Sequence, residues 1–135
     1  LEDAIAGRMA NLCVVPERIE DETEFNAVVC ECDALFAAYE IFAHSSGLVT
    51  KAGVFHKPII VSKGYYMQEV VEKYRLGVAI DQDDSHAVLL ALDVLGDPAE
   101  SERRLGAPDY EGFMRANGVE ALGPAFDKLL ECTTT

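Results

Sequence analysis

Short apolar runs alternate along the chain with segments in which apolar residues recur every three or four positions. The runs at 34–38 and 58–61 have the length of buried strands, and Val78 to Ile80 forms a third. Helical spacing occurs over Phe25 to Cys32, Leu48 to Phe55, Met67 to Tyr74, Val88 to Leu95 and, in one or two helices, Tyr110 to Leu130. Alternation of strands and helices is typical of an α/β fold with a parallel sheet.

The pattern is less regular near both ends of the chain. The positions Leu1, Ile5, Met9 and Leu12 fit one face of a helix, and Leu12 to Val15 fit a short strand that Pro16 stops. Residues 97–108 are polar and contain two prolines and a glycine, which predicts a linking segment. We therefore expect a Rossmann-like core over 1–96, a linking segment over 97–108, and C-terminal helices of the same domain over 109–135.

The connection between the first two strands contains the side chains best suited to binding. They are Glu40, His44, Ser45, Ser46 and Gly47. A helix that begins near Ser45 or Ser46 would place free backbone N–H groups at the carboxyl ends of parallel strands, where such sheets bind ligands. Gly47 would let a ligand approach the backbone, and the hydroxyls would add donors for a diphosphate. The alternative is an ordinary serine cap without a ligand.

The order and spacing of these pieces resemble the donor-binding half of GT-B glycosyltransferases of the family 4 and family 1 type. The matching pieces, within about residues 25–95, are Cys32-Asp33-Ala34-Leu35-Phe36, Tyr39-Glu40, Ser45-Ser46-Gly47, Lys51-Ala52, Lys57-Pro58-Ile59-Ile60-Val61-Ser62, Gly64, Glu69 and Leu76-Gly77. The resemblance implies a Rossmann-like, three-layer, doubly wound parallel sheet that forms one half of a GT-B fold. It also implies a domain truncated before Leu1.

The same resemblance implies a hexosyltransferase that uses a UDP- or GDP-sugar without a metal or other cofactor. Glu40 is expected to contact the donor sugar. The other donor contacts expected from the resemblance are His44, Ser45, Ser46, Gly47, Lys51, Gly64, Tyr65 and Glu69. The acceptor domain and the catalytic base are expected upstream of Leu1, so this fragment alone should be inactive and bind donor weakly or not at all.

Several of these residues also have simpler interpretations. Many retaining members of the family have a glutamate at the position of Lys51, where it binds the ribose hydroxyls. Lys51 could instead approach a phosphate, pair with Glu69 or face solvent, and we favour the last. Glu69 lies at a helix start, where the dipole stabilises it without a substrate. Tyr65 could contact a base or sugar, or pack as an aromatic plug.

Three other functional classes fit parts of the pattern. A non-catalytic GT-B-like binding or scaffolding domain is consistent with Lys51 and with the acidic surface. A fragment of a sugar-nucleotide epimerase would also bind a uridine diphosphate sugar. A phosphate-receiver module is disfavoured because Lys57 precedes its strand, whereas such modules need a lysine at a strand end.

Charge and cysteine usage narrow the range of partners. The chain has 24 acidic and 11 basic residues, a net charge of −13, which argues against nucleic acid or anionic lipid as a partner and also opposes a nucleotide sugar. Four cysteines without paired CxxC spacing fit a reducing cytosol and no structural metal. No apolar stretch has transmembrane length, although peripheral membrane attachment stays open. The apolar face of the closing helix predicts exposed leucines or a homodimer.

Overall fold

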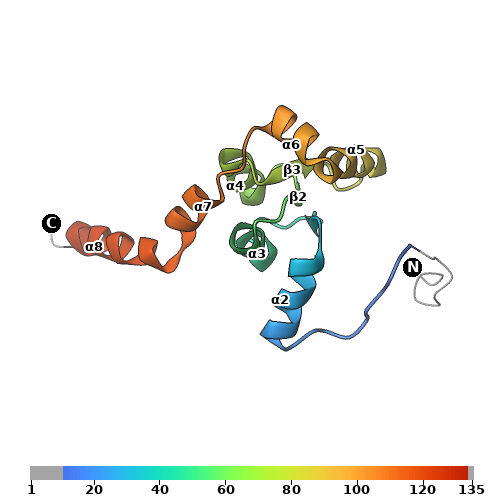
Figure 1. The fold of residues 1–135 in the computed structure, drawn as a ribbon. Helices are drawn as coiled ribbons and strands as arrows, with labels where there is room; N and C mark the ends of the chain where they lie inside the picture. Colours follow the sequence, from blue (N-terminus) through green and yellow to red (C-terminus); the bar gives the residue numbers. More distant parts are fainter. Residues whose placement is uncertain (1–10, 134–135) are drawn as a thin grey trace.

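The computed structural model describes residues 11–133, with side chains described up to Lys128. Three parallel strands form an open sheet in the order β1 (Leu35–Ala37), β2 (Ile59–Ser62) and β3 (Gly77–Ile80). A helix follows each strand, so the predicted α/β class is confirmed (Figure 1).

Seven α-helices are found in the described residues, and polar side chains determine where several of them begin. They are α2 (Glu22–Glu31), α3 (Gly47–Phe55), α4 (Tyr66–Tyr74), α5 (Ser85–Gly96), α6 (Pro98–Leu105), α7 (Tyr110–Asn117) and α8 (Leu122–Thr133), with a 3-10 turn η1 (Val119–Ala121) before α8. The Asp21 carboxylate accepts the Glu24 N–H at 2.8 Å and caps α2. Asp84 caps α5 through the N–H groups of His86 and Ala87. These caps satisfy backbone donors that have no partner within the helix.

Strand β2 separates two apolar clusters, one on each face of the sheet. Ile59 and Val61 point into the larger cluster, which includes residues of α2, α3, α4 and α7. Ile60 points into the smaller cluster with Ala91 and Leu95 of α5. All four β2 residues are buried, as expected for a parallel strand covered by helices on both faces. The predicted three-layer arrangement is therefore present.

The expected double winding is seen only in part. The strands follow one another across the sheet in chain order, so within residues 11–133 the sheet forms one βαβαβ unit without a reversal of strand order. A reversal would need strands on the outer side of β1. The sheet is thus compatible with one half of a Rossmann-like domain.

The strand predicted over Leu12 to Val15 is wrong. This segment has no regular structure, and the side chains of Leu12 and Val15 are 47% and 63% exposed. An apolar run becomes a strand only where a neighbouring edge accepts its hydrogen bonds, and no described strand pairs with it. The helix predicted over the first residues lies outside the described part, apart from Leu12.

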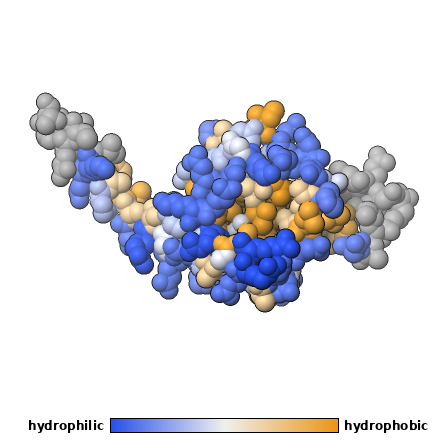
Figure 2. Space-filling model, turned by 90° about the horizontal axis from the view of Figure 1, so that it is seen from above, coloured by the Kyte–Doolittle hydropathy of each residue, from blue (hydrophilic) through white to orange (hydrophobic). Residues whose placement is uncertain are grey.

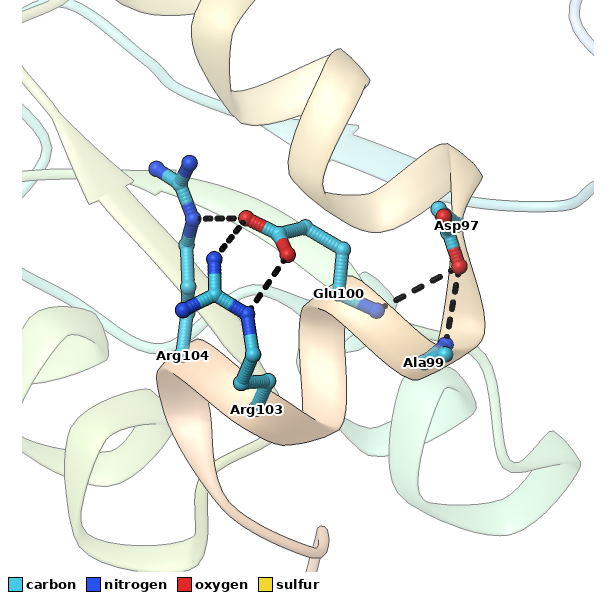
Figure 3. Close-up of polar contacts among 5 residues, drawn as sticks. All are labelled: Asp97, Ala99, Glu100, Arg103 and Arg104. Carbon is cyan, nitrogen blue, oxygen red and sulfur yellow. Dashed lines mark hydrogen bonds and ion pairs between the residues drawn. The ribbon is translucent and has the colours of Figure 1, made fainter.

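Residues 97–108, predicted as a linking segment, instead contain helix α6, which packs against α5. Asp97 ends α5 and caps α6, accepting the Ala99 N–H at 2.9 Å (Figure 3). Pro98 occupies the first turn, where its missing N–H costs nothing, and Gly106 follows the last residue. The supposed breakers therefore bound a helix.

Charged side chains on α6 support this short helix. Glu100 accepts hydrogen bonds from Arg103 at 2.7 and 2.8 Å and also pairs with Arg104 (Figure 3). The hydrogen bonds from the two guanidinium groups hold the pKa of the Glu100 carboxyl below its usual value. Pairs of opposite charge three or four residues apart on one helix face favour the helical conformation.

One or two C-terminal helices were predicted, and the structure has two, α7 and α8. Helix α7 packs on α3 at Gly53, where a Cβ atom would overlap the ring of Phe113. Helix α8 extends away from the sheet (Figure 1), and its residues Leu122 and Phe126 are exposed, in agreement with the predicted apolar face. The predicted homodimer stays a prediction.

Gly77 lies opposite Ile59 in the sheet, and a Cβ at position 77 would overlap the Ile59 carbonyl oxygen. Gly77→Ala should therefore lower the free energy of unfolding by about 2 kcal/mol or more, because the backbone has no room to relax. Gly96→Ala is the matched control, since a Cβ there meets no atom within 4 Å. Urea unfolding of both variants tests this, and equal stabilities would contradict the described register.

Candidate functional site

The loop between β1 and α3 lies at the carboxyl edge of the sheet and leads into a serine-capped helix. Ser46 is the N-cap of α3: its hydroxyl accepts the Leu48 N–H at 3.2 Å, and its carbonyl accepts the Val49 N–H at 3.0 Å. The helix begins at Gly47, as predicted from the position of the serines. Ser45 and Gly47 are exposed on either side of the cap.

Two hydrogen bonds attach this loop to the sheet and to the helix. The buried Ser62 hydroxyl, at the end of β2, donates to the Tyr39 carbonyl at 2.7 Å. The Tyr39 hydroxyl in turn lies 3.2 Å from the Ser46 hydroxyl. The end of β2, the loop after β1 and the cap of α3 are therefore linked through one tyrosine.

Aromatic side chains pack along the same loop. Phe42 lies edge-on to Tyr39, with ring centroids 5.0 Å apart, and edge-on to His44 at 6.0 Å. Ile41 has a left-handed backbone with φ of 48°, which bends the loop where Glu40 and His44 point to solvent. The two predicted polar contacts are thus accessible and carried by a packed loop.

The space beside Gly47 is open. A Cβ atom built on Gly47 meets no atom within 4 Å, and its φ is not in the left-handed region. Neither the turn nor internal packing therefore requires glycine at this position. A ligand that approaches the backbone of the first helical turn would use this space.

The second predicted contact region, after β2, lies at the same edge of the sheet. Gly64 has a φ of +85°, and its N–H donates to the Gln68 side chain at 2.7 Å, so the turn itself explains this glycine. Tyr65 precedes α4 and is half-buried. Between the strand and the glycine, Lys63 pairs with Asp81 at 3.1 Å across the ends of β2 and β3.

Lys51 does not face solvent, contrary to the favoured prediction. Its side chain is 16% exposed and pairs with Glu22, while its ammonium also lies 2.5 Å from the Asn26 side-chain oxygen and 5.2 Å from the centre of the Phe25 ring. These partners all belong to α2, so Lys51 fixes α2 against α3. It pairs neither with Glu69 nor with a group of the 39–47 loop.

Glu69 lies apart from the serine-capped helix start. It is exposed in the first turn of α4 and lines a cavity of about 290 Å³ with Tyr74 and Asn117, between α4 and α7. The structure thus brings Glu40, His44, Ser45, Ser46 and Gly47 onto one loop and helix start, places Gly64 and Tyr65 at the same sheet edge, and directs Lys51 and Glu69 elsewhere.

The sequence did not predict the contacts of three residues that shape this site, although Tyr39 and Ser62 belong to the motifs that carry the resemblance. Tyr39 and Ser62 hold the loop through hydrogen bonds, and Lys63 supplies a cation beside it. Ser62 and Lys63 follow the β-branched run directly, so their position at the carboxyl edge was a usable signal. The partners of Tyr39 are 7 and 23 residues away, and sequence spacing does not reveal such contacts.

The described residues include no group of three His, Cys, Asp or Glu side chains able to hold a metal ion. None of the helices that the structure describes is both long and apolar enough to cross a membrane.

The hydroxyl of Ser46 both caps α3 and contacts Tyr39, so Ser46→Ala should cost about 1 kcal/mol of stability. The neighbouring Ser45 makes no hydrogen bond with another described side chain or backbone group, and Ser45→Ala should leave stability unchanged. Thermal unfolding of both variants is the measurement. A larger loss of stability for Ser45→Ala than for Ser46→Ala would contradict the assignment of Ser46 as the cap.

Lys51→Met keeps the apolar stem of the side chain but removes its pairing with Glu22 and Asn26. Glu22 is largely exposed, but the side chain of Lys51 is mostly buried, so water screens this pair less than a pair that is exposed on both sides. We therefore expect the substitution to lower the free energy of unfolding by about 1 kcal/mol. Lys63→Met is the control, since both members of its pair with Asp81 are at least half exposed and the pair should contribute little. Equal effects of the two substitutions would argue against a tie between α2 and α3.

No protein-family model, curated protein or solved structure matches the chain. The likeness to the donor-binding half of GT-B glycosyltransferases therefore rests on the sequence motifs. The fold is an α/β arrangement with a small open parallel sheet, and its carboxyl edge carries the loop after β1 and the start of α3.

Proposed function

We propose that the chain is the nucleotide-sugar binding part of a metal-independent glycosyltransferase that transfers a sugar to a separate acceptor. The main support is the start of α3, where an open backbone and a serine cap lie at the carboxyl edge of a parallel sheet. Ligands of open α/β sheets bind at this edge, and helix N-termini there favour anions.

The diphosphate of the donor would lie against Gly47. Ser46 already occupies the N–H groups of Leu48 and Val49. The Gly47 N–H and the Ser45 hydroxyl have no hydrogen-bond partner among the described groups, and both are exposed. They are available as donors to phosphate oxygens, and the helix dipole adds to the attraction.

The net charge of −13 opposes an anionic ligand, so local cations matter. Lys63 lies at the same edge, and its pair with Asp81 is exposed on both sides, which makes the pair weak, about 0–1 kcal/mol. The Lys63 ammonium could therefore leave the Asp81 carboxylate and bind a phosphate oxygen at little cost in free energy. Charge-assisted hydrogen bonds to phosphate are stronger than neutral hydrogen bonds. His44 would add positive charge when protonated.

The proposed chemistry divides between this chain and a second domain that would carry the acceptor site. Fixed N–H groups and Lys63 would stabilise the diphosphate leaving group as its bond to the sugar breaks, which needs no metal. Glu40, exposed on the preceding loop, would contact the donor sugar hydroxyls. The acceptor site and the catalytic base would come from that second domain, so we expect the chain alone to bind the donor only weakly, through the anion site, and not to transfer the sugar.

A non-catalytic binding domain of the same architecture is the second candidate. The observation that favours it is Lys51, which is tied to Glu22 and Asn26 and leaves the usual ribose contact without a glutamate. A domain of this kind that serves only as a scaffold would not bind nucleoside diphosphates. Nucleotide binding therefore distinguishes the two functions.

Saturation-transfer NMR of the chain with uridine, guanosine and adenosine diphosphates tests the proposal. We expect one of them to bind with a dissociation constant on the order of 1 mM, about −4 kcal/mol. Gly47→Asp should weaken this binding at least tenfold without unfolding the chain, because it places a side chain and a negative charge in the open space.

Gly123→Asp is the matched control for this experiment. It adds the same charge in the first turn of α8, at a glycine whose Cβ would also meet no atom within 4 Å. Binding should survive Gly123→Asp. The absence of binding by all three nucleotides, or equal binding by Gly47→Asp and wild type, would refute the proposed anion site.

A further inference from the structure

The cavity between α4 and α7 is bounded by helices that lie on one face of the sheet. Helix α4 packs on β2 and β3, α7 packs on α3 and α4, and the two helices lie side by side (Figure 1). The cavity measures about 290 Å³, and five of its lining side chains can form hydrogen bonds: Tyr66, Glu69, Lys73, Tyr74 and Asn117. Its walls are therefore built without any contribution from the outer edge of β1.

The hydroxyl of Tyr74 lacks a hydrogen-bond partner among the described groups. Tyr74 itself is only 8% exposed, and its ring packs edge-on against Phe113 with centroids 5.6 Å apart. Among the described side chains no buried nitrogen or oxygen atom is without a partner, so this hydroxyl reaches solvent, and it does so at the cavity that Tyr74 lines. A tyrosine buried to this extent usually has a partner for its hydroxyl, and a ligand in the cavity would supply one.

Two opposite charges on α4 line the cavity without pairing. Glu69 and Lys73 are four residues apart on one helix face, the spacing at which such residues often pair, yet neither forms an ion pair within the part of the chain whose side chains are described. The Lys73 ammonium instead lies 4.9 Å from the centre of the Tyr74 ring. A cationic ligand would meet this ammonium, and an anionic one would meet the Glu69 carboxylate. The lining thus favours a neutral ligand that both donates and accepts hydrogen bonds.

The remaining walls add an acceptor and a flat apolar surface. The Asn117 amide NH₂ donates to the Phe113 carbonyl at 2.9 Å, which leaves its side-chain oxygen free to accept. Tyr66 is 48% exposed at the start of α4, and its ring offers an apolar face with a hydroxyl at the edge. A sugar ring matches both features, because its C–H groups form an apolar face and its hydroxyls donate and accept hydrogen bonds.

The surroundings also suit a ligand that stays partly in water. Near the base of helix α8, which α7 leads into, the surface is mainly hydrophilic, whereas apolar side chains gather in the middle of the same view (Figure 2). The side chains of Glu69, Lys73 and Asn117 lie at the exposed rim of the cavity. A ligand held there would keep its outer hydroxyls hydrated.

We propose that this cavity binds one ring of a neutral saccharide. The ring would lie against Tyr66, and its hydroxyls would donate to Glu69 and Asn117 and accept from Tyr74. A volume of about 290 Å³ is at the lower limit of small-molecule sites, so the cavity would hold one ring and leave the rest of a longer saccharide in solvent. The site is separate from the start of α3, and the inference does not rest on nucleotide binding there.

Saturation-transfer NMR of the intact chain with maltose, cellobiose, lactose and mannobiose tests this inference, with phenylalanine as a zwitterionic comparison. We expect at least one disaccharide to bind with a dissociation constant on the order of 1 mM and phenylalanine not to bind. Tyr74→Phe, which removes only the hydroxyl, should weaken that binding about fivefold. Tyr66→Ala should also weaken it, and this variant changes a half-exposed side chain, so it keeps the test valid if Tyr74→Phe unfolds.

Tyr110→Phe is the matched control, since it removes the same hydroxyl from a tyrosine of α7 that does not line this cavity. Its affinity for the disaccharide should equal that of the wild type. The inference is overturned if no disaccharide binds, if phenylalanine binds and the disaccharides do not, or if binding survives both Tyr74→Phe and Tyr66→Ala. Saccharide binding should be unchanged in Gly47→Asp, which separates this inference from the proposed nucleotide site.

Discussion

The burial of β2 between two helical layers is the constraint on which the rest of the structure depends. Ile59 and Val61 anchor one cluster and Ile60 the other, so a shift of one residue would exchange the two faces. This register also places Ser62 where its hydroxyl reaches the Tyr39 carbonyl. The conformation of the loop after β1, and with it the start of α3, therefore follows from the packing of one strand.

Much of this arrangement could be predicted from local sequence signals. Pro58 and the β-branched run after it identified the central strand, and the serines before Gly47 identified a helix start, because strand propensity and capping are local properties. Glu40 and His44 are exposed on the loop between the first two strands, and their binding role stays a prediction. Signals of this kind indicate which residues begin an element, and they say little about which elements meet.

The errors arose where a distant partner decides the structure. Lys51 appeared to face solvent, but its partners Glu22 and Asn26 lie 29 and 25 residues earlier on another helix. Leu12 to Val15 had the composition of a strand, but no described strand edge pairs with this segment. The error at residues 97–108 has a local cause. Pro98 and Gly106 were interpreted as breakers of regular structure, although they mark the beginning and the end of helix α6.

We propose that the start of α3 is an anion site positioned by the packing of β2. Its most direct test is a ¹⁵N–¹H correlation spectrum of the chain recorded during titration with uridine or guanosine diphosphate. We expect the largest amide shifts at Ser46, Gly47 and Leu48, followed by Lys63 and Gly64 at the same edge. Largest shifts around Glu69 and the cavity between α4 and α7, or no saturable shifts with either nucleotide, would contradict it.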